Sequence, residues 1–186
     1  MKRILIAGIG NVLLQDDGFG PCVVRILEAR YRFESNVEVA DLGTPGLDLA
    51  DYLMGRDCVI LIDSVKSQQP PGTVLLYRLP EILQRQVEPR MGPHAPALTE
   101  TLLTLDLLGA APAELLLVAV VGHSYEMGCN LSQSVQFSVN SAIAEILREL
   151  ARLGIRFEPK QSAAEPDLWW TKPPVCRSAG TGAAGK

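Results

Sequence analysis

Short runs rich in Val, Ile and Leu alternate along the chain with stretches whose apolar residues recur every three to four positions. Runs that are apolar throughout indicate strands covered on both faces. The strands expected on this basis cover residues 3–7, 37–40, 58–62, 74–77 and 115–121. Helical periodicity between them is typical of βαβ crossovers. The sequence therefore predicts an α/β, doubly wound fold, with a mostly parallel five-stranded sheet and helices on both faces.

Three helices and one edge strand can be placed within this scheme. The clearest helix is expected over about 132–153, because its apolar residues keep the 3.6-residue period and Gly154 can end it. A second helix includes Pro21, which suits a first helical turn, and a third covers about 98–105. Residues 70–78 begin with a Pro-Pro-Gly turn after a short connection, which favours an antiparallel strand at the sheet edge.

The length of 186 residues suffices for one well-buried core and is too short for two ordinary domains. After about residue 157 the composition changes, with four prolines and a small-residue run at the end. We expect an α/β domain over 1–157 and a Pro/Gly-rich C-terminal tail over 158–186, partly disordered. Trp169 and Trp170 lie in this tail, so the alternative is a segment that packs on the domain or on a partner.

Composition and charge exclude several classes of protein. Seventeen basic against 21 acidic residues give a net charge of −4, without the basic excess that neutralises nucleic-acid phosphates. The apolar run 115–121 falls far short of the roughly 20 residues that span a bilayer. The first residues lack a signal-peptide pattern, and the four cysteines stand singly, as reduced thiols do. We expect a cytoplasmic protein that binds neither nucleic acid nor membrane, and we take it to be a monomer.

Acidic residues and a histidine follow the ends of the expected strands. Asp16 and Asp17 lie in the glycine-flanked loop after the first strand, Asp63 ends the third, and His94 precedes the helix at 98–105. In a parallel sheet the loops at the carboxyl ends converge, so these side chains are expected at one rim. For one of the two adjacent aspartates, capping of the following helix is the simpler interpretation. A loop histidine is by itself usually only solvated.

Two carboxylates and an imidazole can serve hydrolysis in two ways. They can coordinate a divalent metal with positions left open for water or substrate, or they can act as acid and base on an amide. A dinucleotide site is the rival interpretation, because a Gly-x-Gly pair follows the first strand and Asp41 ends the next. It is disfavoured, since Leu13 stands where a third glycine should be and the paired aspartates place negative charge where pyrophosphate would bind.

Several motifs together resemble those of the hydrogenase maturation endopeptidases. They are Gly-Ile-Gly-Asn-Val-Leu-Leu-Gln-Asp-Asp-Gly-Phe-Gly at 8–20, Gly-Thr-Pro-Gly at 43–46, Ile-Asp-Ser-Val at 62–65, His94 ahead of a leucine-rich helix, and Leu-Ser-Gln-Ser-Val at 131–135. The resemblance spans about residues 2–155. One departure follows the last strand, where 119–123 reads Ala-Val-Val-Gly-His instead of the Gly-Ile-x-Pro of many members. The class of hydrogenase served is therefore left open.

The resemblance implies an endopeptidase that removes a short C-terminal extension from a nickel–iron hydrogenase large-subunit precursor, after nickel insertion. It also implies that Asp17, Asp63 and His94 contact nickel held by the precursor and keep no permanent metal of their own. Asp17 and Asp63 would be metal contacts or the acid–base pair, with His94 as third contact, all reaching one ion in an open groove. The alternative is a non-enzymatic metallochaperone or precursor-binding module with the same three ligands.

Overall fold

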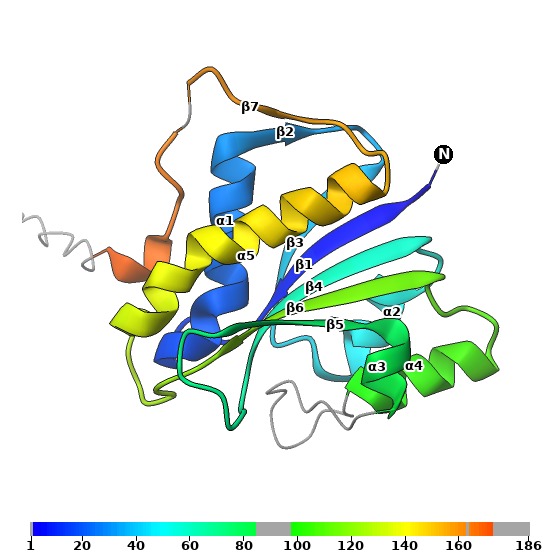
Figure 1. Cartoon of the computed structure of the whole chain (residues 1–186), viewed down its shortest axis with the longest axis horizontal. Helices are drawn as coiled ribbons and strands as arrows, with labels where there is room; N and C mark the ends of the chain where they lie inside the picture. Colours follow the sequence, from blue (N-terminus) through cyan, green and yellow to red (C-terminus); the bar gives the residue numbers. More distant parts are fainter. Residues whose placement is uncertain (1, 85–97, 163, 173–186) are drawn as a thin grey trace, which may run out of the picture.

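A five-stranded sheet forms the centre of the computed structural model, which describes residues 2–84, 98–162 and 164–172 (Figure 1). Its strands are β1 (Ile4–Ile9), β3 (Val37–Gly43), β4 (Cys58–Val65), β5 (Val74–Arg78) and β6 (Glu114–Val121). In space they follow the order β3-β1-β4-β6-β5, and all but β5 run parallel. Because the chain passes from β1 to β3 on one side and then to β4 on the other, the carboxyl ends of β1 and β4 flank the point where the winding reverses.

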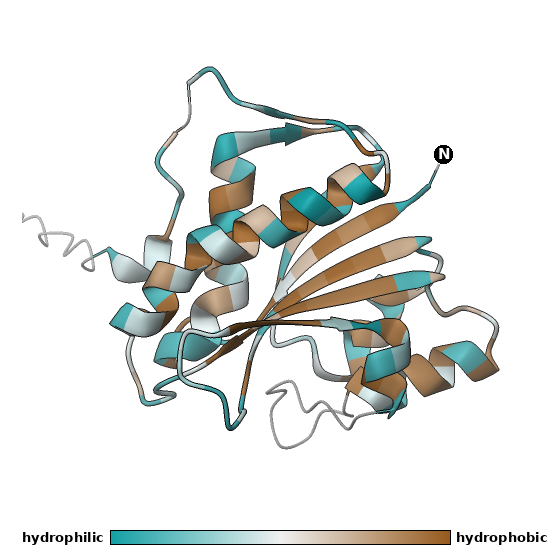
Figure 2. Ribbon diagram, in the orientation of Figure 1, coloured by the Kyte–Doolittle hydropathy of each residue, from teal (hydrophilic) through white to brown (hydrophobic). Residues whose placement is uncertain are grey.

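Helices cover both faces of this sheet (Figure 1). One face carries α1 (Phe19–Arg30) and α5 (Gln133–Arg152), and the other carries α2 (Leu49–Leu53), α3 (Leu79–Gln84) and α4 (Leu98–Leu107). Alternate side chains of β1 enter the two layers, Ile6 on the α1 side and Leu5 on the α2 side. Figure 2 shows the resulting hydrophobic strands between two helical layers. No helix in the described part of the chain is long and apolar enough to cross a membrane.

The predicted doubly wound α/β fold is confirmed, and β5 is the antiparallel edge strand expected from its short connection. The strand β4 continues to Val65, beyond the predicted end at residue 62, because residues 63–65 pair in register with β6. The helix α5 begins and ends close to the predicted bounds, and Gly154 follows it with a φ of 74°. The short helices α2 and α3 are not predicted, since each is too short to show a period.

A small antiparallel ribbon of β2 (Tyr31–Phe33) and β7 (Phe157–Pro159) lies outside the main sheet, and β7 spans the predicted domain boundary. Farther along, the 3-10 helix η3 (Trp169–Thr171) carries both tryptophans. Trp170 is 8% exposed and belongs to the core cluster around α1 and α5, whereas Trp169 is 57% exposed. This part of the tail therefore packs on the domain. Residues 163 and 173–186, on which part of the predicted disorder falls, lie outside the described residues.

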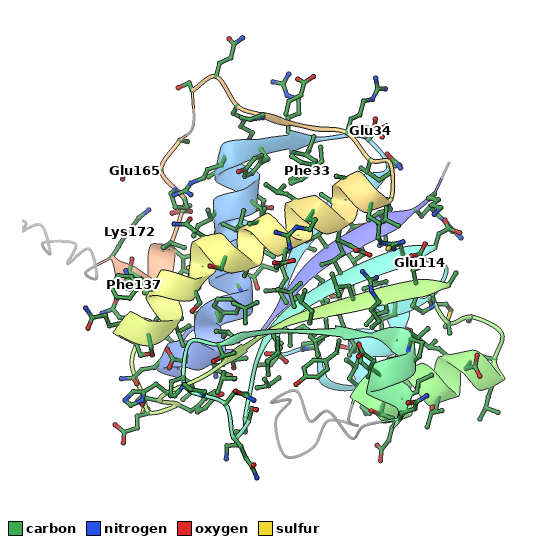
Figure 3. The ribbon with its side chains drawn as sticks, viewed as in Figure 1. Phe33, Glu34, Glu114, Phe137, Glu165 and Lys172 are labelled. Atoms are coloured by element: carbon green, nitrogen blue, oxygen red, sulfur yellow. The ribbon has the colours of Figure 1, made fainter. Side chains whose placement is uncertain are left out.

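A group of charges ties α5 to the amino-terminal edge of the sheet. Glu149 of α5 is only 5% exposed and accepts hydrogen bonds from both terminal nitrogens of Arg78, at 3.0 and 2.9 Å. Arg152 also donates to Glu149, at 3.0 and 2.7 Å, and to Glu114 at the start of β6, which is labelled in Figure 3. Burial raises the pKa of Glu149, but the arginine hydrogen bonds outweigh this effect and lower the pKa to about 2.

Candidate active site

Asp17 and Asp63 lie next to each other at the carboxyl ends of β1 and β4. Asp17 belongs to the 3-10 helix η1 (Gln15–Gly18), between β1 and α1, and Asp63 lies within β4. Ser64 connects them, because its backbone N–H donates to Asp63 Oδ1 at 2.7 Å and its hydroxyl group donates to Asp17 Oδ1 at 3.4 Å. The structure therefore brings together two of the three side chains predicted from the sequence.

Both carboxyl groups are buried, with Asp63 0% exposed and Asp17 4% exposed. Asp63 Oδ2 has no hydrogen-bond partner among the described residues. Burial, reinforced by the charge of Asp17, raises the pKa of Asp63 well above its usual range, although the Ser64 N–H opposes the shift. The expectation of an open groove is therefore wrong for these two side chains. Asp63 tolerates burial because its protonated form carries no charge.

The loop after β1 holds the Asp17 carboxylate in position. The backbone N–H of Asn11 donates to Asp17 Oδ2 at 3.0 Å, and the Asn11 side chain accepts the N–H of Leu13 at 3.0 Å. Gly10 has a φ of 139°, and a Cβ atom there would lie 1.7 Å from the carbonyl oxygen of Asp17. The glycine-rich turn thus has a structural reason that needs no bound phosphate, which weakens the dinucleotide interpretation further.

Helix α1 contacts the sheet through backbone atoms at its first turn. A Cβ atom on Gly20 would lie 2.4 Å from the carbonyl oxygens of both Ile9 and Ile62. A larger residue therefore cannot stand there without moving α1 away from β1 and β4. This contact fixes the distance between η1, which carries Asp17, and the end of β4, which carries Asp63.

Asp16 has a different role from that of its neighbour. Its side chain is fully buried, and Oδ2 accepts the backbone N–H groups of His123 at 2.8 Å and Ser124 at 2.9 Å. Ser132, directly before α5, donates its N–H to Oδ1 at 2.6 Å and its hydroxyl to Oδ2 at 2.8 Å. Gly18, the N-cap residue of α1, makes no side-chain cap hydrogen bond, and these four bonds of Asp16 go to other segments, so Asp16 is not shown to cap α1. Asp16 instead joins η1 to the loop after β6 and to the start of α5.

His94, the third predicted site residue, falls within 85–97 and lies outside the described residues. Over residues 2–84, 98–162 and 164–172, no three His, Cys, Asp or Glu side chains are grouped so as to hold a metal ion. The three-residue metal set therefore stays a prediction. The sequence did not predict that Ser64 links the two carboxyl groups. The feature that could have indicated this link is a hydroxyl side chain directly after Asp63 in an apolar strand.

The fold and these residues define a class of protein. It is an α/β protein with two adjoining carboxyl groups, one favouring its protonated form, where the winding of a parallel sheet reverses. Two neighbouring carboxyl groups can serve the hydrolysis of an amide bond either as acid and base or as ligands of a metal ion.

Comparison with known proteins identifies the family. A family model described as hydrogenase maturation protease matches residues 21–149. The chain is 37% identical to the hydrogenase expression/formation protein HupM of Azotobacter chroococcum, over 88% of this chain and 78% of that protein. It is 32% identical to the hydrogenase 2 maturation protease of Escherichia coli, over 86% of this chain and 98% of that protein. This chain belongs to the hydrogenase maturation protease family, as its motifs predict.

The solved structures agree with this assignment. The hydrogenase maturating endopeptidase HybD from Escherichia coli superposes with a TM-score of 0.76 at 31% identity, covering 85% of this chain and 98% of that one. The hydrogenase 2 maturation peptidase from a Thaumarchaeota archaeon gives a TM-score of 0.62 at 32% identity, covering 81% of this chain and 99% of that one. The predicted family and fold are both confirmed.

Proposed function

We propose that this protease removes the C-terminal extension of a nickel–iron hydrogenase large-subunit precursor once nickel has been inserted. Membership of the maturation protease family supports the substrate class. The buried pair of Asp17 and Asp63, joined through Ser64, supports the assignment of these two residues to the active site. Because Asp63 is buried, a substrate must displace part of its covering before the scissile bond reaches the pair.

The two carboxyl groups divide the work of hydrolysis. Asp17 is held by hydrogen bonds that include those from the Asn11 N–H and the Ser64 hydroxyl, and we assign it as the base. Asp63 favours its protonated form and acts as acid. Asp17 takes a proton from water as the water oxygen attacks the amide carbon, and Asp63 gives its proton to the leaving nitrogen as the C–N bond breaks.

The nickel ion belongs to the precursor and is read as part of the substrate, so that the protease keeps no permanent metal. The alternative role for the pair is contact with this nickel, because Asp63 Oδ2 is buried and has no partner among the described residues. His94 is the third contact in this proposal. The reaction takes place in the cytoplasm, in keeping with the free thiols of Cys22, Cys58 and Cys129.

Incubation of the purified protein with nickel-loaded precursor tests the proposal. The wild type should shorten the precursor on a gel and by mass, and Asp17→Asn, Asp63→Asn and His94→Ala should each lower the rate by at least about 100-fold. Asp57→Asn is the matched control, because Asp57 lies just before the opposite end of β4 and accepts the Arg3 N–H there. Nickel-free precursor should stay uncut.

The outcome also separates a protease from a precursor-binding chaperone. A chaperone would form a complex with the precursor and leave its mass unchanged. Normal processing by the double variant Asp17→Asn, Asp63→Asn would contradict the assignment of these residues, and equal loss in Asp57→Asn would show a general folding defect.

A further inference from the structure

A cavity of about 230 Å³ lies at the loop whose Asn11 N–H donates to Asp17. Residues 10–12 after β1 form one side, and Asp41, Gly43 and Thr44 at the end of β3 form another. The remaining lining residue is Trp169, which comes from η3 near the end of the described chain. Three segments distant in sequence thus meet around a space that fits one amino-acid side chain.

This cavity shares a wall with the active site. Asn11 lines it and donates its backbone N–H to Asp17 Oδ2 at 3.0 Å. Gly10 also lines it, and its Cα lies so close to Asp17 that a Cβ atom would collide with the Asp17 carbonyl oxygen. A peptide whose scissile bond lies at Asp17 therefore passes the cavity within a residue or two of that bond.

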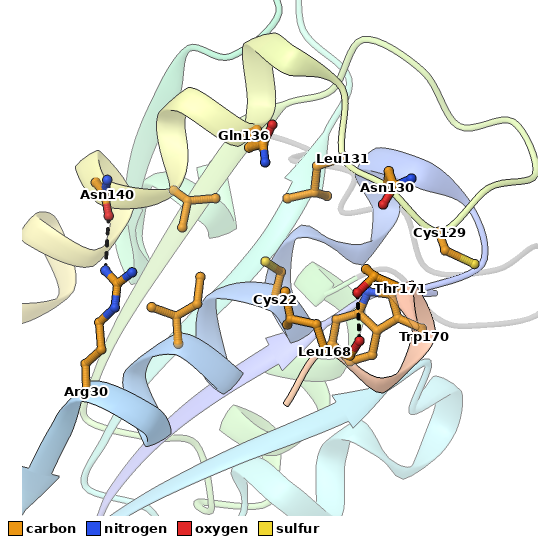
Figure 4. A pocket seen from close by; sticks show the side chains of 12 residues that line it. Cys22, Arg30, Cys129, Asn130, Leu131, Gln136, Asn140, Leu168, Trp170 and Thr171 are labelled. Atoms are coloured by element: carbon orange, nitrogen blue, oxygen red, sulfur yellow. Dashed lines mark hydrogen bonds between the residues drawn. The ribbon is translucent and has the colours of Figure 1, made fainter. Parts of the chain in front are cut away.

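Trp169 is held in place by the buried residue that follows it. Trp170 lines a separate cavity of about 360 Å³ together with Cys22 of α1 and with Leu168, as Figure 4 shows. The two indole rings meet edge to face, with centroids 5.7 Å apart and an interplanar angle of 87°. Thr171 donates its N–H at 3.0 Å and its hydroxyl at 2.9 Å to the Leu168 carbonyl oxygen, which closes the turn. The Trp169 ring is thus 57% exposed and supported on one side by the buried ring of Trp170.

We propose that Trp169 is a specificity-determining residue, whose ring forms one wall of a subsite for a precursor side chain beside the scissile bond. The inference rests on the proposed function and adds a residue outside the segment 21–149 that the family model matches. A rigid aromatic side chain gives contact area at little cost in conformational entropy. The occupant is a side chain of the extended precursor chain, because the cavity is continuous with the Asp17 loop.

Cleavage kinetics of Trp169→Ala on the nickel-loaded precursor provide the test. We expect KM to rise by about tenfold with kcat nearly unchanged, since the ring contacts the substrate away from the reacting atoms. Trp169→Phe should recover most of the affinity because it restores an aromatic wall. Phe137→Ala is the matched control, since Phe137 is a 72% exposed aromatic residue on α5 that does not line the cavity, and its KM should equal that of the wild type.

A binding measurement separates failure of this inference from failure of the proposed function. The dissociation constant of the precursor is measured with Asp63→Asn and with the double variant Asp63→Asn, Trp169→Ala, and it should be about tenfold higher for the double variant. If the wild type does not cut but this ratio is found, the subsite stands and the proposed activity falls. Ratios within about twofold in both KM and dissociation constant, or a Phe137→Ala effect as large, would overturn the subsite.

Discussion

Asp63→Asn should change how the stability of the protein depends on pH, because it removes a carboxyl group that resists ionisation when folded. Burial and the charge of Asp17 raise the pKa of Asp63 in the native state. In the unfolded chain the group ionises near its ordinary value of 3.8. Between these two values the native state holds one proton more than the unfolded state, so the contribution of Asp63 to stability is present below 3.8 and lost as pH rises. Each pH unit in that window should lower the stability of the wild type relative to the variant by about 1.4 kcal/mol.

Urea denaturation of both proteins between about pH 4 and pH 7 measures this difference. The free energies of unfolding should diverge in favour of Asp63→Asn as pH rises, until the native pKa is passed. The comparison between two proteins cancels the titration of groups that they share, apart from any change in Asp17 itself. Parallel curves over the whole range would refute the reasoning, because they would mean that Asp63 ionises in the folded protein as readily as in the unfolded one.

Two further predictions concern charges buried away from Asp63. Glu149→Gln should show the opposite dependence on pH. The pKa of Glu149 is lowered from 4.5 to about 2 in the folded protein, so the contribution of Glu149 to the free energy of unfolding is lost as the pH falls from 4.5 toward 2. Because both arginine partners are half exposed, we expect the variant to lose about 2 kcal/mol of the free energy of unfolding at pH 7. In urea denaturation this loss should vanish near pH 2. A loss that does not depend on pH would contradict the prediction. Asp16→Asn replaces one acceptor oxygen by an NH2 group, which then faces a buried donor, and it should lower the melting temperature by about 5 °C in calorimetry. An unchanged melting temperature would show that the four hydrogen bonds to Asp16 contribute little.

Most of the fold could be predicted because its main elements are long enough to carry a period. The five strands are apolar on both faces, and α5 repeats its apolar residues over 20 residues. The ribbon of β2 and β7 could not be predicted, because each strand has three residues and the pairing depends on where α1 and α5 end. The composition predicted a C-terminal tail. It did not show that Trp170 belongs to the core, because this packing depends on contacts with α1 and α5, which are distant in sequence.

The sequence was sufficient to place two of the three predicted site residues together, but it did not show their surroundings. The rule that parallel strands converge at their carboxyl ends was sufficient to place Asp17 near Asp63. It could not show that both groups are buried, because burial depends on side chains from other segments. The partners of Asp16 were equally hidden, since His123, Ser124 and Ser132 follow it by more than a hundred residues.

The glycine contact between α1 and the sheet limits how this enzyme can diversify. With Gly20 lying against the backbone of Ile9 and Ile62, a larger residue at this position would push α1, and with it η1 and Asp17, away from the end of β4. On the proposal made for Trp169, a change of substrate preference can instead arise in the C-terminal segment, which contacts the site from outside the sheet. The backbone contact sets where the two aspartates lie, whereas the C-terminal segment can change without altering that contact.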